Sequence, residues 1–316
     1  MDFGIQNSSK PMNPFSNENS YRDSSMFIGD VVEHTTSWLT INPYKGCSLQ
    51  CAYCFRFKWG SDSAKPILET EVEVAVENLL AHKDFVPNIT AISINVSSTD
   101  ALLPNVKKST FKAIELLEAK KLTNPFGITT KLGFLKSDIE FLENLQFIKP
   151  IVFVSLAFIP KHIEPTPIEP RLKNLALFAQ SKVPCVLYFR PIVSGWNDSD
   201  ETIEKALILG NKYCNAICIG SLRLSPEIRN ELEIVGESMS NYEDDFHLKK
   251  FHDNTENRIL FIYKKLNLQV PLFKHTSCAV SHLNNLPNYN LLFKNPKNNC
   301  LETCPIQQQI LCNTSI

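Results

Sequence analysis

The sequence lacks any apolar run of about 18 residues or more, the length that a membrane-spanning helix requires. It also lacks the basic and apolar segments of a secretory signal, because residues 1–20 are rich in serine and asparagine instead. These absences argue against the membrane and secreted classes. We therefore expect a cytoplasmic protein without a membrane partner.

An excess of charge of either sign is also missing. The chain carries 32 Lys and Arg against 33 Asp and Glu, a formal net charge of −1. A nearly neutral chain has no general electrostatic attraction for nucleic acid. Nucleic acid is therefore a disfavoured partner, although a local basic groove would still allow it. The lysine groups at 249–250, 264–265 and 294–297 are candidates for such a groove.

Cysteine, by contrast, is abundant: there are ten, and most of them are grouped. In a chain without a secretory signal, tight groups of cysteine indicate metal ligands in a reducing compartment. The tightest group is Cys47, Cys51 and Cys54, spaced C-x3-C-x2-C. Three thiolates hold three irons of a cubane and leave the fourth iron open, whereas a cluster that only carries electrons has four protein ligands.

The alternative for this triad is a zinc knuckle or three structural thiols. Zinc sites usually combine two knuckles to reach four ligands. No second knuckle lies near residues 47–54 in the sequence. The cluster interpretation is therefore favoured.

Strand-like and helix-like segments alternate from 37 to 235, between a polar N-terminal extension (1–36) and a C-terminal extension (236–316). Such alternation predicts an α/β fold with a parallel sheet, but does not choose between a barrel and a doubly wound sheet. Strands are expected at 38–41, 91–96, 126–130, 151–158, 186–193 and 216–222, and helices at 66–82, 106–121, 136–147, 170–181 and 200–212.

The residues around the triad form a recognisable pattern. Asn-Pro-Tyr-Lys-Gly-Cys spans 42–47, Tyr53 stands directly before the third cysteine, and Phe55 follows it. This run resembles the signature of the radical S-adenosylmethionine (SAM) superfamily. Its Asn-Pro-Tyr start is similar to the branch that contains spore photoproduct lyase.

Further elements of that branch follow in order within residues 40–225. They are Ser98-Thr99-Asp100, Thr129-Thr130-Lys131 and the segment 190–198. Leu132 stands where the branch has serine, and Ser194 where it has proline. The resemblance implies a partial (β/α)6 TIM-like barrel with the cluster at the carboxyl ends of its strands, where α/β barrels place their active sites.

The resemblance also implies roles for individual residues. Cys47, Cys51 and Cys54 would hold a [4Fe–4S] cluster whose open iron binds SAM, and Arg190 joins them as a candidate catalytic residue. The expected SAM site has Tyr53 and Phe55 beside the cluster, Ser98, Thr99 and Asp100 at the amino group, Lys131 at the carboxylate, Ser155 at the ribose, and Arg190 at a carboxylate or substrate oxygen.

Each polar residue in this set also has a purely structural interpretation. Asp100 would cap the turn at 101–104, and Lys131 would be a solvated loop charge. Arg190 would form a salt bridge at the barrel rim, and Ser155 would be a small core residue. The sequence leaves both interpretations open.

Four further cysteines lie in the C-terminal extension: Cys278, Cys300, Cys304 and Cys312. Four thiolates fit a second, fully ligated [4Fe–4S] cluster. The alternative is tetrahedral zinc, held by all four or by three of them with His275 or His282. Spore photoproduct lyase lacks this set, which argues against its DNA-repair activity for this chain.

The expected function is therefore reductive cleavage of SAM to a 5′-deoxyadenosyl radical, which abstracts hydrogen from a peptide or a small metabolite. An external donor such as flavodoxin or ferredoxin would supply the electron. One alternative is a nucleic-acid base repair or modification enzyme with a structural zinc in the tail. Another is a non-catalytic electron-transfer or zinc-binding protein.

Overall fold

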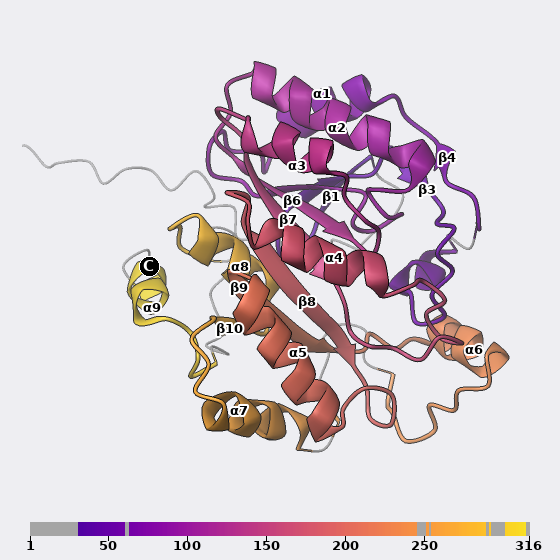
Figure 1. The fold of residues 1–316 in the computed structure, drawn as a ribbon. Helices are drawn as coiled ribbons and strands as arrows, with labels where there is room; N and C mark the ends of the chain where they lie inside the picture. The colour runs from indigo at the N-terminus through magenta and orange to yellow at the C-terminus, as the bar shows by residue number, and fades with distance from the viewer. Residues whose placement is uncertain are drawn as a thin grey trace, which may run out of the picture.

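A single twisted sheet forms the centre of the computed structural model, which describes residues 31–60, 63–244, 251–252, 254–288, 291 and 301–313. Its order is β1-β2-β5-β6-β7-β8-β9-β10, and every adjacent pair is parallel except β1 and β2 (Figure 1). The strands are β1 (Val32–His34), β2 (Leu39–Ile41), β5 (Ile92–Ile94), β6 (Pro125–Thr130), β7 (Lys149–Ser155), β8 (Cys185–Ile192), β9 (Ala216–Ser221) and β10 (Leu272–Phe273).

The strands expected from the sequence are β2 and β5 to β9, and all are confirmed. Within the described ranges, β1 and β10 end the sheet without pairing with each other, so the sheet is open, as a partial barrel requires. Both end strands come from segments assigned to the extensions. The segment 268–273, which contains β10, is strand-like in the sequence, whereas β1 was not expected, because so short a strand leaves little periodic signal.

Helices α1 to α5 cover the outer face of the sheet (Figure 1). Leu187 and Phe189 of β8 and Ile217 and Ile219 of β9 point to this side, because side chains along a strand alternate between its faces. The helices are α1 (Val72–Ala81), α2 (Pro104–Ala119), α3 (Lys136–Glu143), α4 (Glu169–Phe178) and α5 (Asp200–Tyr213).

Their starts follow ordinary capping chemistry. Pro104 opens α2 at a position where the missing amide hydrogen costs nothing, and the Ser199 side chain accepts from the amide of Thr202 at the start of α5. The helix expected over 66–82 begins only at Val72. Residues 67–68 instead form β4 (Ile67–Leu68), which pairs with β3 (Tyr44–Lys45) beside the cysteine loop.

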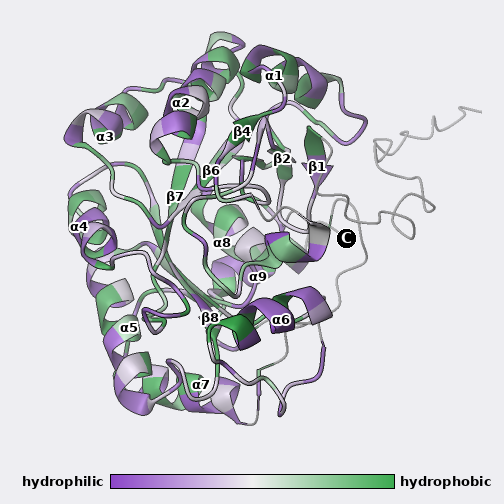
Figure 2. Ribbon diagram, turned by 90° about the vertical axis from the view of Figure 1, so that its right-hand side faces the viewer, coloured by the Kyte–Doolittle hydropathy of each residue, from purple (hydrophilic) through white to green (hydrophobic). Residues whose placement is uncertain are grey.

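The C-terminal segment fills the concave face of the sheet. Phe153, Val186 and Cys218 point inward and share one buried cluster with Ala279 and Val280 of α8 (Thr276–Leu283). Figure 2 shows α8 and α9 (Ile306–Asn313) within the curve of the sheet, with α1 to α5 around its outside. The extension therefore completes the core of the barrel.

Three remaining elements lie around this core: the 3-10 helix η1 (Phe55–Trp59), α6 (Pro226–Ile234) and α7 (Thr255–Lys265). The sequence did not predict α6. Its start is nevertheless regular, with the Ser225 side chain accepting from the amide of Ile228 and proline in the first turn. No helix in the described part of the chain is long and apolar enough to cross a membrane.

Candidate active site

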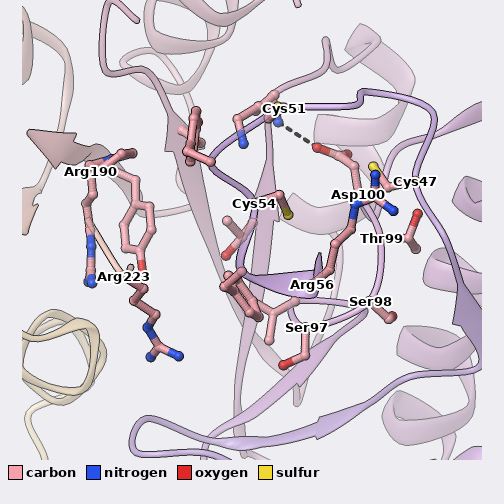
Figure 3. Close-up of a pocket in the computed structure, with 18 of the residues that line it drawn as sticks. Cys47, Cys51, Cys54, Arg56, Ser97, Ser98, Thr99, Asp100, Arg190 and Arg223 are labelled. Carbon is pink, nitrogen blue, oxygen red and sulfur yellow. Dashed lines mark hydrogen bonds between the residues drawn. The ribbon is translucent and has the colours of Figure 1, made fainter. Parts of the chain in front are cut away.

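A cavity of about 240 Å³ lies at the carboxyl ends of the parallel strands (Figure 3). Its walls come from the cysteine loop, the ends of β5 to β9, the segment before β2 and the first residue of α8. Every barrel residue that the sequence singled out lines this cavity: Cys47, Cys51, Cys54, Tyr53, Phe55, Ser98, Thr99, Asp100, Lys131, Ser155 and Arg190.

The cysteine loop is held on both sides by backbone hydrogen bonds. The Cys47 amide donates to the Ser63 carbonyl at 3.0 Å, and the Ala52 amide donates to the Ile163 carbonyl at 2.9 Å. Gly46 has φ +86°, and a Cβ at this position would lie 2.6 Å from the Lys65 carbonyl oxygen. Glycine is therefore required for the chain to turn into the loop.

The three thiols lie in one electrostatic environment. Burial raises the pKa of Cys47, and burial raises that of Cys51 to about 12, opposed by the charge of Lys131. Coulombic interaction with Cys54 raises both values further. Two of the three thiols are buried and the third is half-buried. As mutually repelling thiolates they need a positive group among them, and iron supplies it. This donor set fits an iron–sulfur cluster with three protein ligands.

No three His, Cys, Asp or Glu side chains in the described ranges converge on a point that holds a single metal ion. A cubane distributes three thiolates over three separate irons, so it does not need such a point. Thr99 also lines this cavity, and its buried Oγ1 has no hydrogen-bond partner within the described ranges. A buried hydroxyl of this kind fits the polar groups of SAM.

Asp100 has the capping role that the sequence left open. Its Oδ1 accepts from the Leu102 amide at 2.9 Å and from Thr130 Oγ1 at 2.7 Å, and its Oδ2 accepts from the Lys131 amide at 2.7 Å. Burial raises its pKa, while these donors lower it. Asp100 thus ties the loop after β5 to the end of β6. Its contact with the amino group of SAM remains a prediction.

Lys131 is not a solvated loop charge. Its Nζ lies 3.8 Å from Glu164 Oε2 and 5.4 Å from the centre of the Tyr53 ring. Burial lowers its pKa, but Cys51, Tyr53 and Glu164 raise it well above the ordinary value. Lys131 therefore stays positively charged beside the triad, as binding of a carboxylate requires.

Glu164 is the centre of a buried network that no sequence motif marked. It accepts from the Tyr53 hydroxyl and from the Arg171 guanidinium. The remaining donors of Arg171, which is fully buried, bond to three carbonyls: Ser155 at 3.1 Å, Thr166 at 2.7 Å and Pro167 at 3.2 Å. Tyr53 stands between two cysteines of the triad, so this network attaches the cysteine loop to the segment that follows β7.

Arg190 lies at the end of β8 with its guanidinium 4.9 Å from the Tyr188 ring centre, and it donates to Thr276 Oγ1 at 3.4 Å. No carboxylate in the described ranges forms an ion pair with it, so the rim salt bridge is not observed there. Arg223, which the sequence did not single out, lines the same wall and lies 5.3 Å from the Phe55 ring centre.

No family model matches this sequence, and no curated protein matches it either. Solved structures do. A spore photoproduct lyase variant with bound AdoMet and dinucleoside spore photoproduct has a TM-score of 0.56 and 13% identity, covering 72% of this chain and 73% of that chain. A second variant of that lyase has a TM-score of 0.54 and 13% identity, covering 76% and 75%. The fold is that of the radical SAM enzymes.

Ser155 and the segment 190–198 have clear places in this radical SAM fold. The carbonyl of Ser155 holds Arg171, while its side chain lines the cavity. In the turn after β8, Gly195 has φ +81°, and the buried Asn197 donates to the carbonyls of Ala157 and Pro191 at 2.5 and 2.9 Å. The turn therefore fixes the end of β8 and with it Arg190.

Three of the tail cysteines belong to the described residues, and they lie in the C-terminal segment on the concave side of the sheet (Figure 2). Cys278 of α8 and Cys304 belong to the inner-face cluster, and Cys278 Sγ accepts from Asn288 Nδ2 at 3.0 Å. Cys312 lies on α9, and its Sγ accepts from Gln308 Nε2 at 3.2 Å. Cys300 lies outside the described residues. The second cluster therefore remains a prediction.

The two histidines considered as zinc ligands lie at the ends of α8. His275 precedes the helix, and its carbonyl lies 3.9 Å from Cys218 Sγ. The His282 ring packs against Phe273 at 5.5 Å between centres, and burial lowers its pKa. Neither position tests whether the tail holds zinc or a cluster.

Proposed function

We propose that this chain is a radical SAM enzyme in which Cys47, Cys51 and Cys54 hold a [4Fe–4S] cluster and SAM binds its open iron. One observation carries the proposal. The three thiols share a single cavity with the polar ends of four neighbouring strands, β5 to β8, in a structure with the radical SAM fold. Isolated structural thiols or an electron-carrying cluster do not need such a cavity.

The chain's own residues have separate tasks in this proposal. Lys131 offers its fixed positive charge to the SAM carboxylate, because Glu164 and Tyr53 hold it beside the triad. Thr99 offers a hydroxyl, and Ser155 faces the same space from β7. When bound, the cluster and SAM supply the difficult chemistry, reductive cleavage to a 5′-deoxyadenosyl radical that abstracts hydrogen from substrate.

We infer that the substrate is a peptide or a small metabolite, and that an external flavodoxin or ferredoxin in the cytoplasm supplies the electron. The nucleic-acid alternative needs a basic groove. Of its candidate lysines, Lys264 is paired with Glu302 at 2.6 Å, while 249–250 and 294–297 lie outside the described residues. Tight, salt-dependent binding of DNA in a fluorescence titration would favour that alternative.

The proposed activity is tested by anaerobic reconstitution with iron and sulfide, followed by dithionite and SAM. We expect the full chain to bind SAM and to form 5′-deoxyadenosine. The Cys214→Ala variant should behave like the wild type, because Cys214 ends α5 and does not line the cavity. A protein with an intact front cluster that neither binds SAM nor forms 5′-deoxyadenosine contradicts the proposal.

We further propose that Cys278, Cys300, Cys304 and Cys312 hold an auxiliary [4Fe–4S] cluster, supported by the thiol-rich donor set beside the concave face of the barrel. The wild type should then contain about eight irons per chain, and the double variant Cys300→Ala/Cys304→Ala, which keeps only two tail thiolates, about four. Elemental analysis for iron and zinc makes the measurement. About four irons with one zinc in the wild type, and unchanged iron in the double variant, would show a zinc tail instead.

A further inference from the structure

Two arginines lie together on the wall of the cavity opposite Asp100 and Thr99 (Figure 3). Arg190 lies near the carboxyl end of β8, and Arg223 follows the end of β9 by two residues. The two strands are adjacent and parallel, so their carboxyl ends bring both side chains to one edge of the sheet. This edge is separate from the ends of β5 and β6, where the expected SAM ligands lie.

The position of Arg190 is built into the fold. A Cβ on Gly220 of the neighbouring strand would lie 2.7 Å from Arg190 Nε, so glycine leaves the space in which the guanidinium rests. Tyr188 supports the group from one side, and its hydroxyl bonds to Thr276 Oγ1 at 3.0 Å. Thr276 in turn accepts from Arg190 Nη1 at 3.4 Å. An arginine fixed this way keeps most of its donors for another partner.

Arg223 adds a second charge to the same wall. Burial lowers its pKa to about 10, and the neighbouring charge of Arg190 contributes to the decrease. The negative charge of Glu33 raises the pKa of Arg223 and so opposes this decrease. Two half-buried guanidinium groups on one wall of the cavity give that wall a positive potential, which favours a bound anion.

We propose that Arg190 and Arg223 form a subsite for an oxyanion of the substrate, a carboxylate or a phosphate group. The planar guanidinium presents paired donors that match the two oxygens of such a group. The inference rests on the proposed function in one respect: the group that binds here is part of the molecule from which hydrogen is abstracted. It narrows the substrate class to anionic peptides or metabolites.

The carboxylate of SAM itself has a different partner. Lys131 lies against the ring of Tyr53 within the triad loop, whereas Arg190 packs on Tyr188 and bonds to Thr276 at the other side of the cavity. Arg223 borders the cysteine loop through the ring of Phe55, which follows the triad. The arginines are thus placed to hold a second molecule beside SAM within the same cavity.

The test measures binding of inorganic phosphate, acetate and SAM separately, by calorimetry on the full chain with its clusters assembled. Arg190→Gln and Arg223→Gln should each weaken binding of phosphate or acetate about tenfold or more, and change SAM affinity less than about twofold. Lys131→Gln should instead weaken binding of SAM and leave binding of phosphate and acetate nearly unchanged. Comparison of phosphate with acetate shows which oxyanion the wall prefers.

Two variants control for the loss of charge and for damage to the fold. Arg258→Gln removes an arginine that pairs with Asp200 at 2.6 Å outside the cavity, and it should leave binding of both anions unchanged. Gly220→Ala keeps both charges but displaces Arg190, and it should also weaken anion binding. Circular dichroism verifies that each variant is folded.

Two results would overturn the inference. One is a wild-type protein that binds neither phosphate nor acetate at millimolar concentration. The other is a loss of SAM affinity in Arg190→Gln and Arg223→Gln as large as that in Lys131→Gln. That result would show that the arginines bind SAM and not an oxyanion of the substrate. Anion binding that depends on both arginines, in a protein that forms no 5′-deoxyadenosine, would support the subsite and contradict the proposed function alone.

Discussion

Replacement of Cys51 by alanine is expected to remove the front cluster and, with it, all formation of 5′-deoxyadenosine. Two remaining thiolates cannot hold the three irons that the proposed site requires. Cys51 is almost completely buried in the cavity wall, so no outside ligand replaces it easily. With an auxiliary cluster in the tail, iron should fall from about eight to about four per chain.

Iron analysis and the 5′-deoxyadenosine assay make this measurement. The loop should survive the substitution, because the adjacent Ala52 amide still bonds to the Ile163 carbonyl. Circular dichroism checks that point. Cys214→Ala is the matched control, since it removes a partly exposed cysteine outside the cavity. Full iron content and undiminished activity in Cys51→Ala would show that the triad is not the cluster site.

Replacement of Glu164 by alanine is expected to lower the free energy of unfolding by about 3–5 kcal/mol, because it leaves the buried Arg171 charge without its partner. The same change frees the Tyr53 hydroxyl between Cys51 and Cys54 and removes the carboxylate nearest Lys131. Cluster retention and SAM affinity should therefore fall together with stability. Urea unfolding followed by circular dichroism gives the free energy.

Glu140→Ala is the control for this prediction. Glu140 forms an exposed pair with Lys136 at 3.6 Å within α3, and such pairs contribute about 0.3–0.5 kcal/mol. The two variants remove the same side chain from a buried and an exposed ion pair. Equal unfolding free energies for Glu164→Ala and Glu140→Ala would show that the buried network does not stabilise the fold.

The main strands and outer helices were predictable from the sequence for a physical reason. Buried strands such as 151–155 are continuous apolar runs, and α5 has both an amphipathic pattern and a serine cap. The cysteine triad was predictable because its three members lie within eight consecutive residues, so their spacing can be read directly from the sequence. β1 and α6 were missed because each is too short or too weakly patterned to stand out from its surroundings, whereas β10 lies within the strand-like segment 268–273.

The site was only partly predictable, because several of its contacts join distant segments. Glu164 meets the motif residue Tyr53 across 111 residues and Arg171 across 7, and neither Glu164 nor Arg171 belongs to a motif. Arg223 joins Arg190 only because β8 and β9 are neighbours in the sheet. Asp100 was singled out correctly as a cavity residue, but its bonds to Thr130 and Lys131 depend on the pairing of β5 with β6.

The central claim is that the triad holds a cluster whose open iron binds SAM. Electron–nuclear double resonance tests it most directly, on the reduced double variant Cys300→Ala/Cys304→Ala, in which only the front cluster should remain. With SAM labelled by ¹⁵N in the amino group and ¹⁷O in the carboxylate, we predict couplings from both labels to the cluster. Bound SAM that shows neither coupling would contradict the account.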